Sequence, residues 1–348
     1  MSDRSWFVLG VDLGSTTAKA VVADGTGAIR AAEVVQLGAV SRTAAARAIE
    51  AALAAAGIDR DRVRRTIGTG YGRRLVTGAD RTFTEITCHA RGAAALRPGV
   101  RLVIDIGGQD SKAIVVDDEG LVERFAMNDR CASGTGRFFD VLARALETDI
   151  GDIGRLALAG SAELEISSMC ATFAETEVIS MLAQGAEPAD IAASVHRAVA
   201  ARTVGLIAQV GKAFPAVMTG GVAKNPAARA FLADALRGEV ELLDQPQIAG
   251  AYGAALLALD ECRGASALAL PEELPAPDTA GAAGVPHCAA CDGSGPVPIA
   301  LRAPSGPGTG ARTGSRRVAT DDDGATPTGD RLIAGVAVAP GARSGDRS

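Results

Sequence analysis

The stretch Asp12-Leu-Gly-Ser-Thr-Thr-Ala-Lys19 decides the fold, because it recurs as Asp105-Ile-Gly-Gly-Gln-Asp-Ser-Lys112. In both copies a glycine stands two residues after the aspartate, and the lysine stands seven residues after the aspartate. Apolar runs flank both turns, so each copy predicts a strand, a tight turn and a second strand. Two unrelated turns would rarely share this spacing. The repeat therefore indicates an internal duplication.

The two turns have the composition of a phosphate site. Backbone N–H groups and hydroxyls in Gly14-Ser-Thr-Thr17 can donate to phosphate oxygens, and the Asp12 carboxylate suits a hydrated Mg²⁺ ion. No Gly-Lys-[Ser/Thr] sequence opens a helix here, so the stretch is not a P-loop. One such turn alone would be a weak signal. Its duplication favours phosphate binding over packing.

Two cysteines stand at the starts of predicted helices. Cys131 precedes a turn that opens a helix from Arg137 to about Glu147, and Cys170 precedes a capping box that starts at Thr172. The positive end of a helix favours thiolate or cluster charge. Two cysteines cannot complete a four-ligand site, but two copies of the chain supply four, enough for an iron–sulfur cubane or a zinc ion shared across a dimer axis. Two buried structural cysteines are the alternative.

Composition limits the class of protein. Of 348 residues, 47% are hydrophobic but only 3% are aromatic, so the core is expected to consist of Ala, Val, Leu and Ile. The net charge of −6 argues against a nucleic-acid surface but allows a small anionic ligand. The sequence shows no signal-peptide core and no apolar run of membrane length, which predicts a soluble cytoplasmic protein without a membrane partner. Six cysteines then point to metal or redox chemistry.

Other segments predict further elements of an α/β fold. We expect a strand at 64–68 and helices at 41–57, 85–96, 188–213 and from about 245 to 262. His89 falls at the start of one of these helices, where a hydrogen-bonded structural role is expected, and His196 falls near the middle of another, where we expect a surface or packing residue. Gly220-Gly221 follows a strand at 216–218 and would allow the backbone to approach a nucleobase or ribose closely.

The chain divides into three expected parts. Residues 1–120 and 121–264 would form two halves, with a last helix at 247–262 that could pack back on the first half. Residues 265–348 contain no aromatic residue and 10 of the 15 prolines, which predicts a disordered tail. Within it, Cys288 and Cys291 form a lone Cys-x-x-Cys pair, which we interpret as an incidental dithiol.

The hairpins, the Gly-Gly turn and the last helix resemble the acetate and sugar kinase, Hsp70 and actin superfamily. Its members fold as two RNase H-like halves with ATP in the cleft between them. Four longer motifs resemble, more narrowly, the BadF/BadG/BcrA/BcrD ATPase family, and within it the activators of 2-hydroxyacyl-CoA dehydratases. These motifs are Ile104–Asp110, Met127–Phe138, Ile166–Glu177 and Met218–Asn225. The resemblance covers about residues 5–262, and the tail departs from it.

The resemblance implies a homodimer with one [4Fe-4S] cluster, in which Cys131 and Cys170 of each subunit are the ligands. It also implies ATP and Mg²⁺ as ligands, with Asp12 binding the metal. The implied catalytic residues are Asp12, Asp105 and Gln109. Those implied to hold phosphates are Gly14, Ser15, Thr16, Thr17, Lys19, Gly107, Gly108 and Asp110. Those implied to surround the nucleoside are Gly220, Gly221, Asn225 and Gln247.

The implied activity is ATP-driven transfer of a low-potential electron from a ferredoxin or flavodoxin to a 2-hydroxyacyl-CoA dehydratase. Three alternatives share parts of the pattern. A benzoyl-CoA reductase subunit would carry the same motifs inside a permanent complex. A sugar or small-molecule kinase would share the ATP fold without needing the paired cysteines. A binding module of the Hsp70 or actin type would switch partners with nucleotide and would be colourless.

Overall fold

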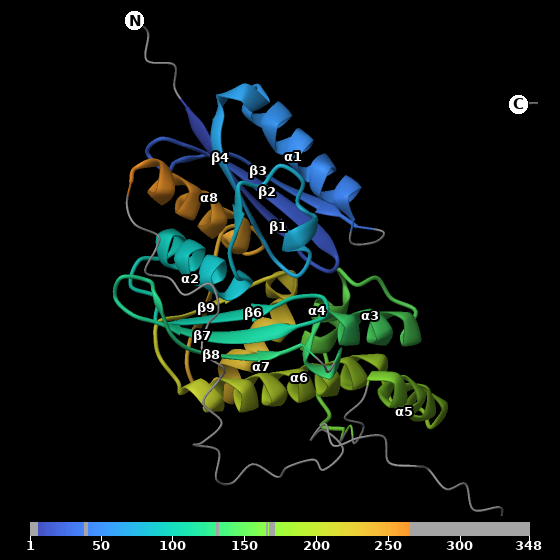
Figure 1. Ribbon diagram of the computed structural model, residues 1–348. Helices are drawn as coiled ribbons and strands as arrows, with labels where there is room; N and C mark the ends of the chain where they lie inside the picture. The colour runs from blue at the N-terminus through green and yellow to red at the C-terminus, as the bar shows by residue number, and fades with distance from the viewer. Residues whose placement is uncertain (1–5, 38–40, 130–131, 165, 167–170, 265–348) are drawn as a thin grey trace, which may run out of the picture. The chain divides into compact units, whose positions relative to one another are not determined.

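The computed structural model describes residues 6–37, 41–129, 132–164, 166 and 171–264. These residues all belong to one compact unit, Met1–Val285. Figure 1 shows two sheets with helices packed against them. The first sheet has the order β3-β2-β1-β4-β5, and its strands are β1 (Phe7–Leu13), β2 (Thr17–Asp24), β3 (Ile29–Gln36), β4 (Val63–Thr69) and β5 (Arg81–Thr82).

The second sheet repeats the topology of the first. Its order is β10-β9-β6-β7-β8, and its strands are β6 (Leu102–Ile106), β7 (Ser111–Val116), β8 (Val122–Asn128), β9 (Ala216–Thr219) and β10 (Val240–Leu242). In each sheet three strands form an antiparallel meander, and two parallel strands extend it from the first strand of the meander. The duplication inferred from the hairpins therefore extends to all five strands.

Eight α-helices accompany the sheets in the described part of the chain. They are α1 (Arg42–Ala56), α2 (Glu85–Leu96), α3 (Gly136–Ala145), α4 (Ile153–Leu158), α5 (Ala171–Ala183), α6 (Pro188–Val210), α7 (Pro226–Leu236) and α8 (Ala249–Cys262). Capping residues determine where several of these helices begin and end. The Ser41 hydroxyl accepts from Ala44 N at 3.2 Å to cap α1, and Gly57 ends that helix at a φ of 65°.

Most expected elements are present, with two differences. The last helix begins at Ala249 and not near 245, because residues 245–248 form a turn before it. The sheet topology also moves the boundary expected at residue 120. Strands β6 and β7 lie in the second sheet, so the second half begins near Leu102. α8 packs against the first sheet, where its alanines and leucines meet Val8, Val21 and Ile67.

Helices α2 and α8 cross with almost no space between their backbones. A Cβ atom added at Gly92 would contact Ala249 O, and one added at Gly253 would contact Cys88 O. α2 also packs through Ile86, Ala90 and Ala93 against buried valines of the second sheet. The two helices therefore join the halves, since α8 belongs to the core of the first sheet.

Helix α6 is long and apolar enough, by length and composition, to cross a membrane. However, 61% of its most apolar window is buried inside the protein, as in the core helix of a globular domain. Near its middle lies His196, which is 1% exposed and therefore has the packing role expected. Burial lowers the pKa of this imidazole to about 4, and the hydrogen bond from its Nδ1 to Ala192 O only partly opposes the shift.

This low pKa predicts a loss of stability in mild acid. Below its ordinary pKa of about 6.5, His196 takes up a proton in the unfolded chain but not in the folded one, so unfolding becomes easier as the pH falls from 6.5 to 4. Between pH 7 and pH 5 we expect His196 to contribute a loss of about 2 kcal/mol in the free energy of unfolding.

The measurement is urea denaturation at both pH values for wild type and His196→Phe. The variant should lack this part of the pH dependence. The other titrating groups contribute equally in both proteins, so their contributions cancel when the two changes in unfolding free energy are subtracted. An equal pH dependence in both proteins would show that folding does not lower the pKa of His196.

Candidate functional site

The two repeated turns have the same backbone geometry. Gly14 N donates to Thr17 O at 3.0 Å, and Gly107 N donates to Asp110 O at 2.9 Å. In both hairpins the aspartate and the lysine are register partners on adjacent antiparallel strands. This register places the two side chains on the same face of each sheet, at the end where the turn begins.

Each lysine forms an ion pair with the aspartate of its own hairpin. Lys19 Nζ lies 3.0 Å from Asp12 Oδ2, and Lys112 Nζ lies 3.1 Å from Asp105 Oδ2. Lys112 is 1% exposed and also lies 2.6 Å from Asp110 Oδ2 and 3.4 Å from Glu85 Oε2. Burial alone would lower the pKa of Lys112, but the carboxylates of Asp105, Glu85 and Asp110 raise it above its usual value. The ammonium group therefore stays charged.

Asp105 is held in its ionised form. Its Oδ1 atom accepts a hydrogen bond from Thr219 Oγ1 at 2.9 Å and lies 3.4 Å from His89 Nδ1. Burial would raise the pKa of this carboxyl, but His89, Lys112 and the Thr219 hydrogen bond together lower it well below its ordinary value. A buried carboxylate that stays charged at neutral pH is a suitable group to orient a hydrated cation.

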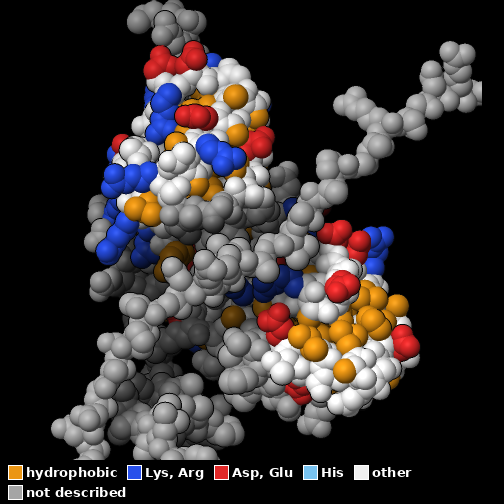
Figure 2. Space-filling model, turned by 90° about the vertical axis from the view of Figure 1, so that its right-hand side faces the viewer, with side chains coloured by type: hydrophobic (Ala, Val, Ile, Leu, Met, Phe, Trp, Pro, Cys, Tyr) orange, Lys and Arg blue, Asp and Glu red, His pale blue; other side chains and the backbone are white. Residues whose placement is uncertain are grey.

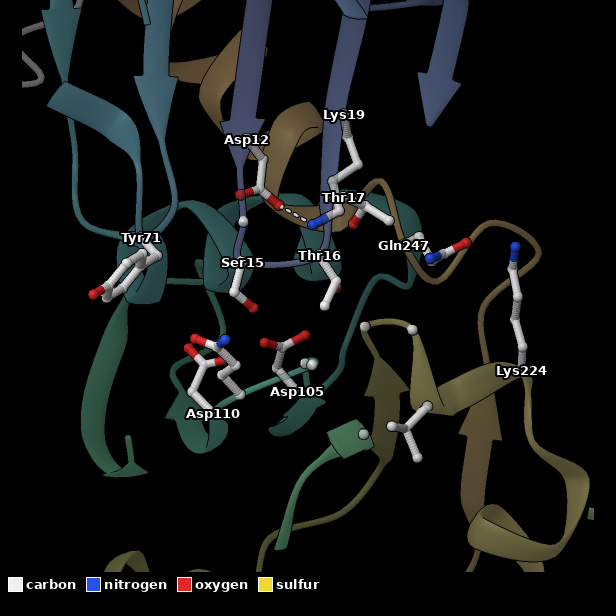
Figure 3. A pocket seen from close by; sticks show the side chains of 18 of the residues that line it. Asp12, Ser15, Thr16, Thr17, Lys19, Tyr71, Asp105, Asp110, Lys224 and Gln247 are labelled. Atoms are coloured by element: carbon white, nitrogen blue, oxygen red, sulfur yellow. Dashed lines mark hydrogen bonds and ion pairs between the residues drawn. The ribbon is translucent and has the colours of Figure 1, made fainter. Parts of the chain in front are cut away.

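The two turns face each other across a cavity of about 760 Å³. Figure 3 shows Ser15 and Thr16 pointing from the first turn toward Asp105 and Asp110 of the second half. The approach is close, because a Cβ atom added at Gly108 would lie 2.8 Å from Thr16 Oγ1. Only glycine fits at that position without a shift of the Thr16 side chain. The cavity volume is within the range of about 300–1,000 Å³ that is usual for small-molecule sites.

The cavity brings together the described residues that the sequence singled out for ATP. All of them line it: Asp12, Gly14, Ser15, Thr16, Thr17, Lys19, Asp105, Gly107, Gly108, Gln109, Asp110, Gly220, Gly221, Asn225 and Gln247. Cys131 and Cys170 lie outside the described residues. Among the residues that the structure describes, no group of three or more His, Cys, Asp and Glu side chains is arranged to hold a metal ion.

The end of the cavity assigned to the nucleoside is shaped by a glycine turn. Gly220 has a φ of 88°, and a Cβ atom there would contact Ile106 O. Gly220 N donates to Pro246 O at 3.0 Å, which holds the Gly-Gly turn against the segment that carries Gln247. In Figure 3, Gln247 and Lys224 lie on the opposite side of the cavity from Tyr71.

Sequence reasoning missed the contribution of α2. Glu85 and His89 both line the cavity, although His89 was expected to be structural and Glu85 was assigned no role. Their i, i+4 spacing puts them on one face of the helix, and that spacing was the available signal. His89 is 5% exposed and also lies 3.4 Å from Thr219 Oγ1. Burial raises the pKa of Glu85, while the charge of Lys112 opposes the shift.

The remaining described cysteines are packing residues. Cys88 is fully buried, and burial raises the pKa of its thiol to about 12. Burial also raises the pKa of the Cys262 thiol. Neither thiol would readily form the thiolate that binds metal or attacks an electrophile.

Comparison with known proteins gives several close relatives. The chain is 44% identical over 254 residues to an activator of lactoyl-CoA dehydratase from Anaerotignum propionicum, which is 73% of this chain and 98% of that protein. The structure matches the Acidaminococcus fermentans (R)-2-hydroxyglutaryl-CoA dehydratase component A with a TM-score of 0.71 and 42% identity, covering 74% of this chain and 99% of that one.

Two further matches are an activator solved with a bound nucleotide and a subunit of a different enzyme. The activator of the 2-hydroxyisocaproyl-CoA dehydratase from Clostridium difficile, solved with bound ADPNP, matches with a TM-score of 0.71 and 38% identity over 78% of this chain and all of that one. A benzoyl-CoA reductase subunit from Thauera aromatica is 36% identical over 197 residues, which is 55% of this chain and 69% of that protein.

The family assignment rests on most of the chain. Residues 9–258 match one family, and this range contains both hairpin turns, the Gly-Gly turn and the larger part of α8. The fold of two α/β halves, expected from the resemblance to the ATPase superfamily, is confirmed by the two repeated sheets and by the activator structures. The chain belongs to the BadF/BadG/BcrA/BcrD ATPase family.

Proposed function

We propose that this protein is an ATP-dependent activator that carries a [4Fe-4S] cluster and passes a low-potential electron to a 2-hydroxyacyl-CoA dehydratase in the cytoplasm. The observation that carries the proposal is the identity of 44% to an activator over 98% of that activator's length. The cavity supports it, because the residues expected to hold ATP converge there from both halves.

The residues of the cavity fit a magnesium nucleotide. The N–H groups and hydroxyls of residues 14–17 and the glycines of the second turn would surround the phosphates, and Asp12 would bind hydrated Mg²⁺. The Gly220-Gly221 turn, Asn225 and Gln247 would border the nucleoside. The nucleotide bound to a related activator supports this ligand class.

Hydrolysis requires a water molecule aligned with the γ-phosphate. Asp105 is buried and ionised and lines the cavity, while Gln109 is exposed on the same turn. We assign Asp105 to orient the water and the hydrated cation through its charge, with Gln109 as a second hydrogen-bonding group. Lys112 and Thr219 would hold the Asp105 carboxylate in place, since both contact it directly.

The cluster would be shared by two copies of the chain. Cys170 directly precedes α5 and Cys131 directly precedes the turn before α3, and these two helices contact each other. A four-thiolate cluster needs two further cysteines, which a second copy would supply. When bound, the cluster would supply one-electron chemistry at low potential, with a ferredoxin or flavodoxin as the electron donor.

An exposed apolar surface near these helices supports the dimer. Figure 2 shows hydrophobic side chains gathered on the lower part of one face. On α5, Ile179 is 55% exposed, and Leu158 at the end of α4 is 51% exposed. A contiguous group of exposed apolar side chains, as opposed to single ones, favours a partner surface over contact with solvent.

A second candidate function is favoured by one match. The similarity to a benzoyl-CoA reductase subunit supports an ATP-binding role within a permanent reductase complex. Purification would distinguish the two, because an activator should be isolated as a separate homodimer. A small-molecule kinase or an Hsp70-type module should instead be colourless after anaerobic purification.

The direct test of this function is activation of a partner enzyme. Under anaerobic conditions the protein, a chemical reductant and Mg-ATP should activate a 2-hydroxyacyl-CoA dehydratase component, measured as dehydration of its substrate. ADP or ADPNP in place of ATP should give no activation. Full activation without ATP hydrolysis would refute the proposed coupling.

Removal of the C-terminal segment should leave the activity intact. The family match ends at residue 258 and the described structure at Gly264. Truncation after Gly264 should therefore change the ATPase rate, dimer formation and iron content by less than about twofold. Gel filtration, phosphate release and iron analysis would check these values. Loss of iron on truncation would instead assign Cys288 and Cys291 as cluster ligands.

A further inference from the structure

His196 makes a hydrogen bond with each of its ring nitrogens, although it is 1% exposed. Its Nδ1 atom lies 2.7 Å from Ala192 O, and its Nε2 atom lies 2.9 Å from Asn225 Nδ2. A carbonyl oxygen only accepts, so Nδ1 carries the proton and Nε2 is an unprotonated acceptor. The Asn225 amide therefore donates to the ring, and the orientation of both side chains is determined.

Asn225 connects this ring to the cavity and to α7. Its Oδ1 atom accepts from the backbone N–H groups of Ala227 at 3.0 Å and Ala228 at 3.1 Å, so it caps the first turn of α7. The same residue lines the nucleotide cavity. With both ends of its amide engaged, Asn225 cannot move without breaking the helix cap or the bond to His196.

The imidazole ring also packs between two phenylalanines. Its centroid lies 4.5 Å from that of Phe139 in α3 and 6.1 Å from that of Phe231 in α7. Phe139 is 2% exposed within the core and also lines the cavity. One rigid ring therefore contacts two cavity residues, Asn225 by a hydrogen bond and Phe139 by packing. Phe139 belongs to the helix that follows Cys131 in sequence.

We propose that His196 is a positioning residue that transmits occupancy of the nucleotide cavity to helix α3. This inference rests on the proposed function, because it requires a nucleotide in the cavity. A ligand that displaces Asn225 acts on the ring through the Nε2 hydrogen bond, and the ring acts on α3 through Phe139. The response of α3 should depend on this bond, while nucleotide binding at the two hairpin turns should not.

The test is hydrogen exchange on the full-length protein under anaerobic conditions, with and without saturating Mg-ADPNP. In wild type the nucleotide should slow amide exchange at residues 14–17. It should also change the exchange rates of α3, and this change is the α3 response. His196→Phe keeps a ring between the phenylalanines but removes the acceptor for Asn225. Protection at residues 14–17 should remain in this variant, while the α3 response should fall at least threefold.

Two further variants separate this role from a general disturbance of α6. His196→Gln restores an acceptor oxygen and should recover most of the α3 response. Thr203→Val removes a buried hydroxyl from the same helix, whose Oγ1 donates to Val199 O at 3.0 Å, and should respond like wild type. If His196→Phe does not fold, Asn225→Ser removes the same hydrogen bond from its other end while keeping a helix cap.

The outcomes are distinct. An unchanged α3 response in His196→Phe, or in Asn225→Ser at saturating nucleotide, would overturn the role of His196 and leave the proposed function standing. An equal loss in Thr203→Val would also overturn it, since any disturbance of α6 would then suffice. Absence of protection at residues 14–17 in wild type would overturn nucleotide binding at the hairpins, and this inference with it.

Discussion

The Asp105→Asn protein should hydrolyse Mg-ATP about 100- to 1,000-fold more slowly than wild type, a loss of about 3–4 kcal/mol of transition-state stabilisation. The carboxylate is buried, ionised and part of the cavity wall, and an amide of the same shape carries no charge to balance a cation and has only one acceptor oxygen to orient water. Lys112 would still contact Asp110 and Glu85, so we expect the fold to persist.

Steady-state phosphate release is the measurement, with thermal unfolding as the check on folding. Asp117→Asn is a matched control. Asp117 follows β7 of the same sheet, and its Oδ1 atom only accepts from the backbone N–H groups of Glu119 and Leu121 in a turn. Asp12→Asn should behave like the Asp105 variant. Turnover within threefold of wild type in both variants would show that the paired hairpins do not hold the reacting phosphate.

Replacement of Cys131 or Cys170 by serine should abolish the cluster. Wild type should contain about four irons per dimer after anaerobic purification, and each variant should contain almost none, because a dimer that has lost the same cysteine from both copies lacks the four thiolates of a cubane. The dimer should loosen as well, since the cluster would join the two subunits. Iron and sulfide analysis, the absorption spectrum and gel filtration together measure the effect.

Cys262→Ser serves as the control for this experiment. Its thiol is partly buried at the end of α8, and burial raises its pKa, so the substitution should leave iron content unchanged. Retention of the cluster in the Cys131 or Cys170 variant would exclude that residue as a ligand. Four irons per monomer, in place of four per dimer, would exclude a cluster shared between subunits.

The sequence predicted the two hairpins because they are local and repeated, whereas their convergence on one cavity was implied by the resemblance to the ATPase superfamily. The seven-residue spacing from Asp12 to Lys19 and from Asp105 to Lys112 corresponds to register partners across a turn. Helix ends with strong caps were predicted within a residue or two, as at α1 and α2. Nothing tertiary is needed for such features, since side chains and turns close in sequence determine them.

Features that depend on packing between distant segments were not predicted. Strand β3 (Ile29–Gln36) has no buried residue, only half-buried and exposed ones, and its two alanines reduce the contrast between its faces further. The boundary near residue 120 was wrong because β6 and β7 resemble β1 and β2 locally, and only the pairing of β6 with β9 shows which sheet they join. The bond between His196 and Asn225 spans 29 residues and has no local signature.

The central claim is that the nucleotide cavity controls the cluster, and iron chelation measures this directly. Wild-type protein would be incubated anaerobically with an excess of iron chelator in the presence of Mg-ADPNP or Mg-ADP at equal saturation. If the γ-phosphate changes the angle between the two halves, iron should be removed severalfold faster with Mg-ADPNP than with Mg-ADP. Identical rates with the two nucleotides, in a protein that binds both, would contradict the coupling.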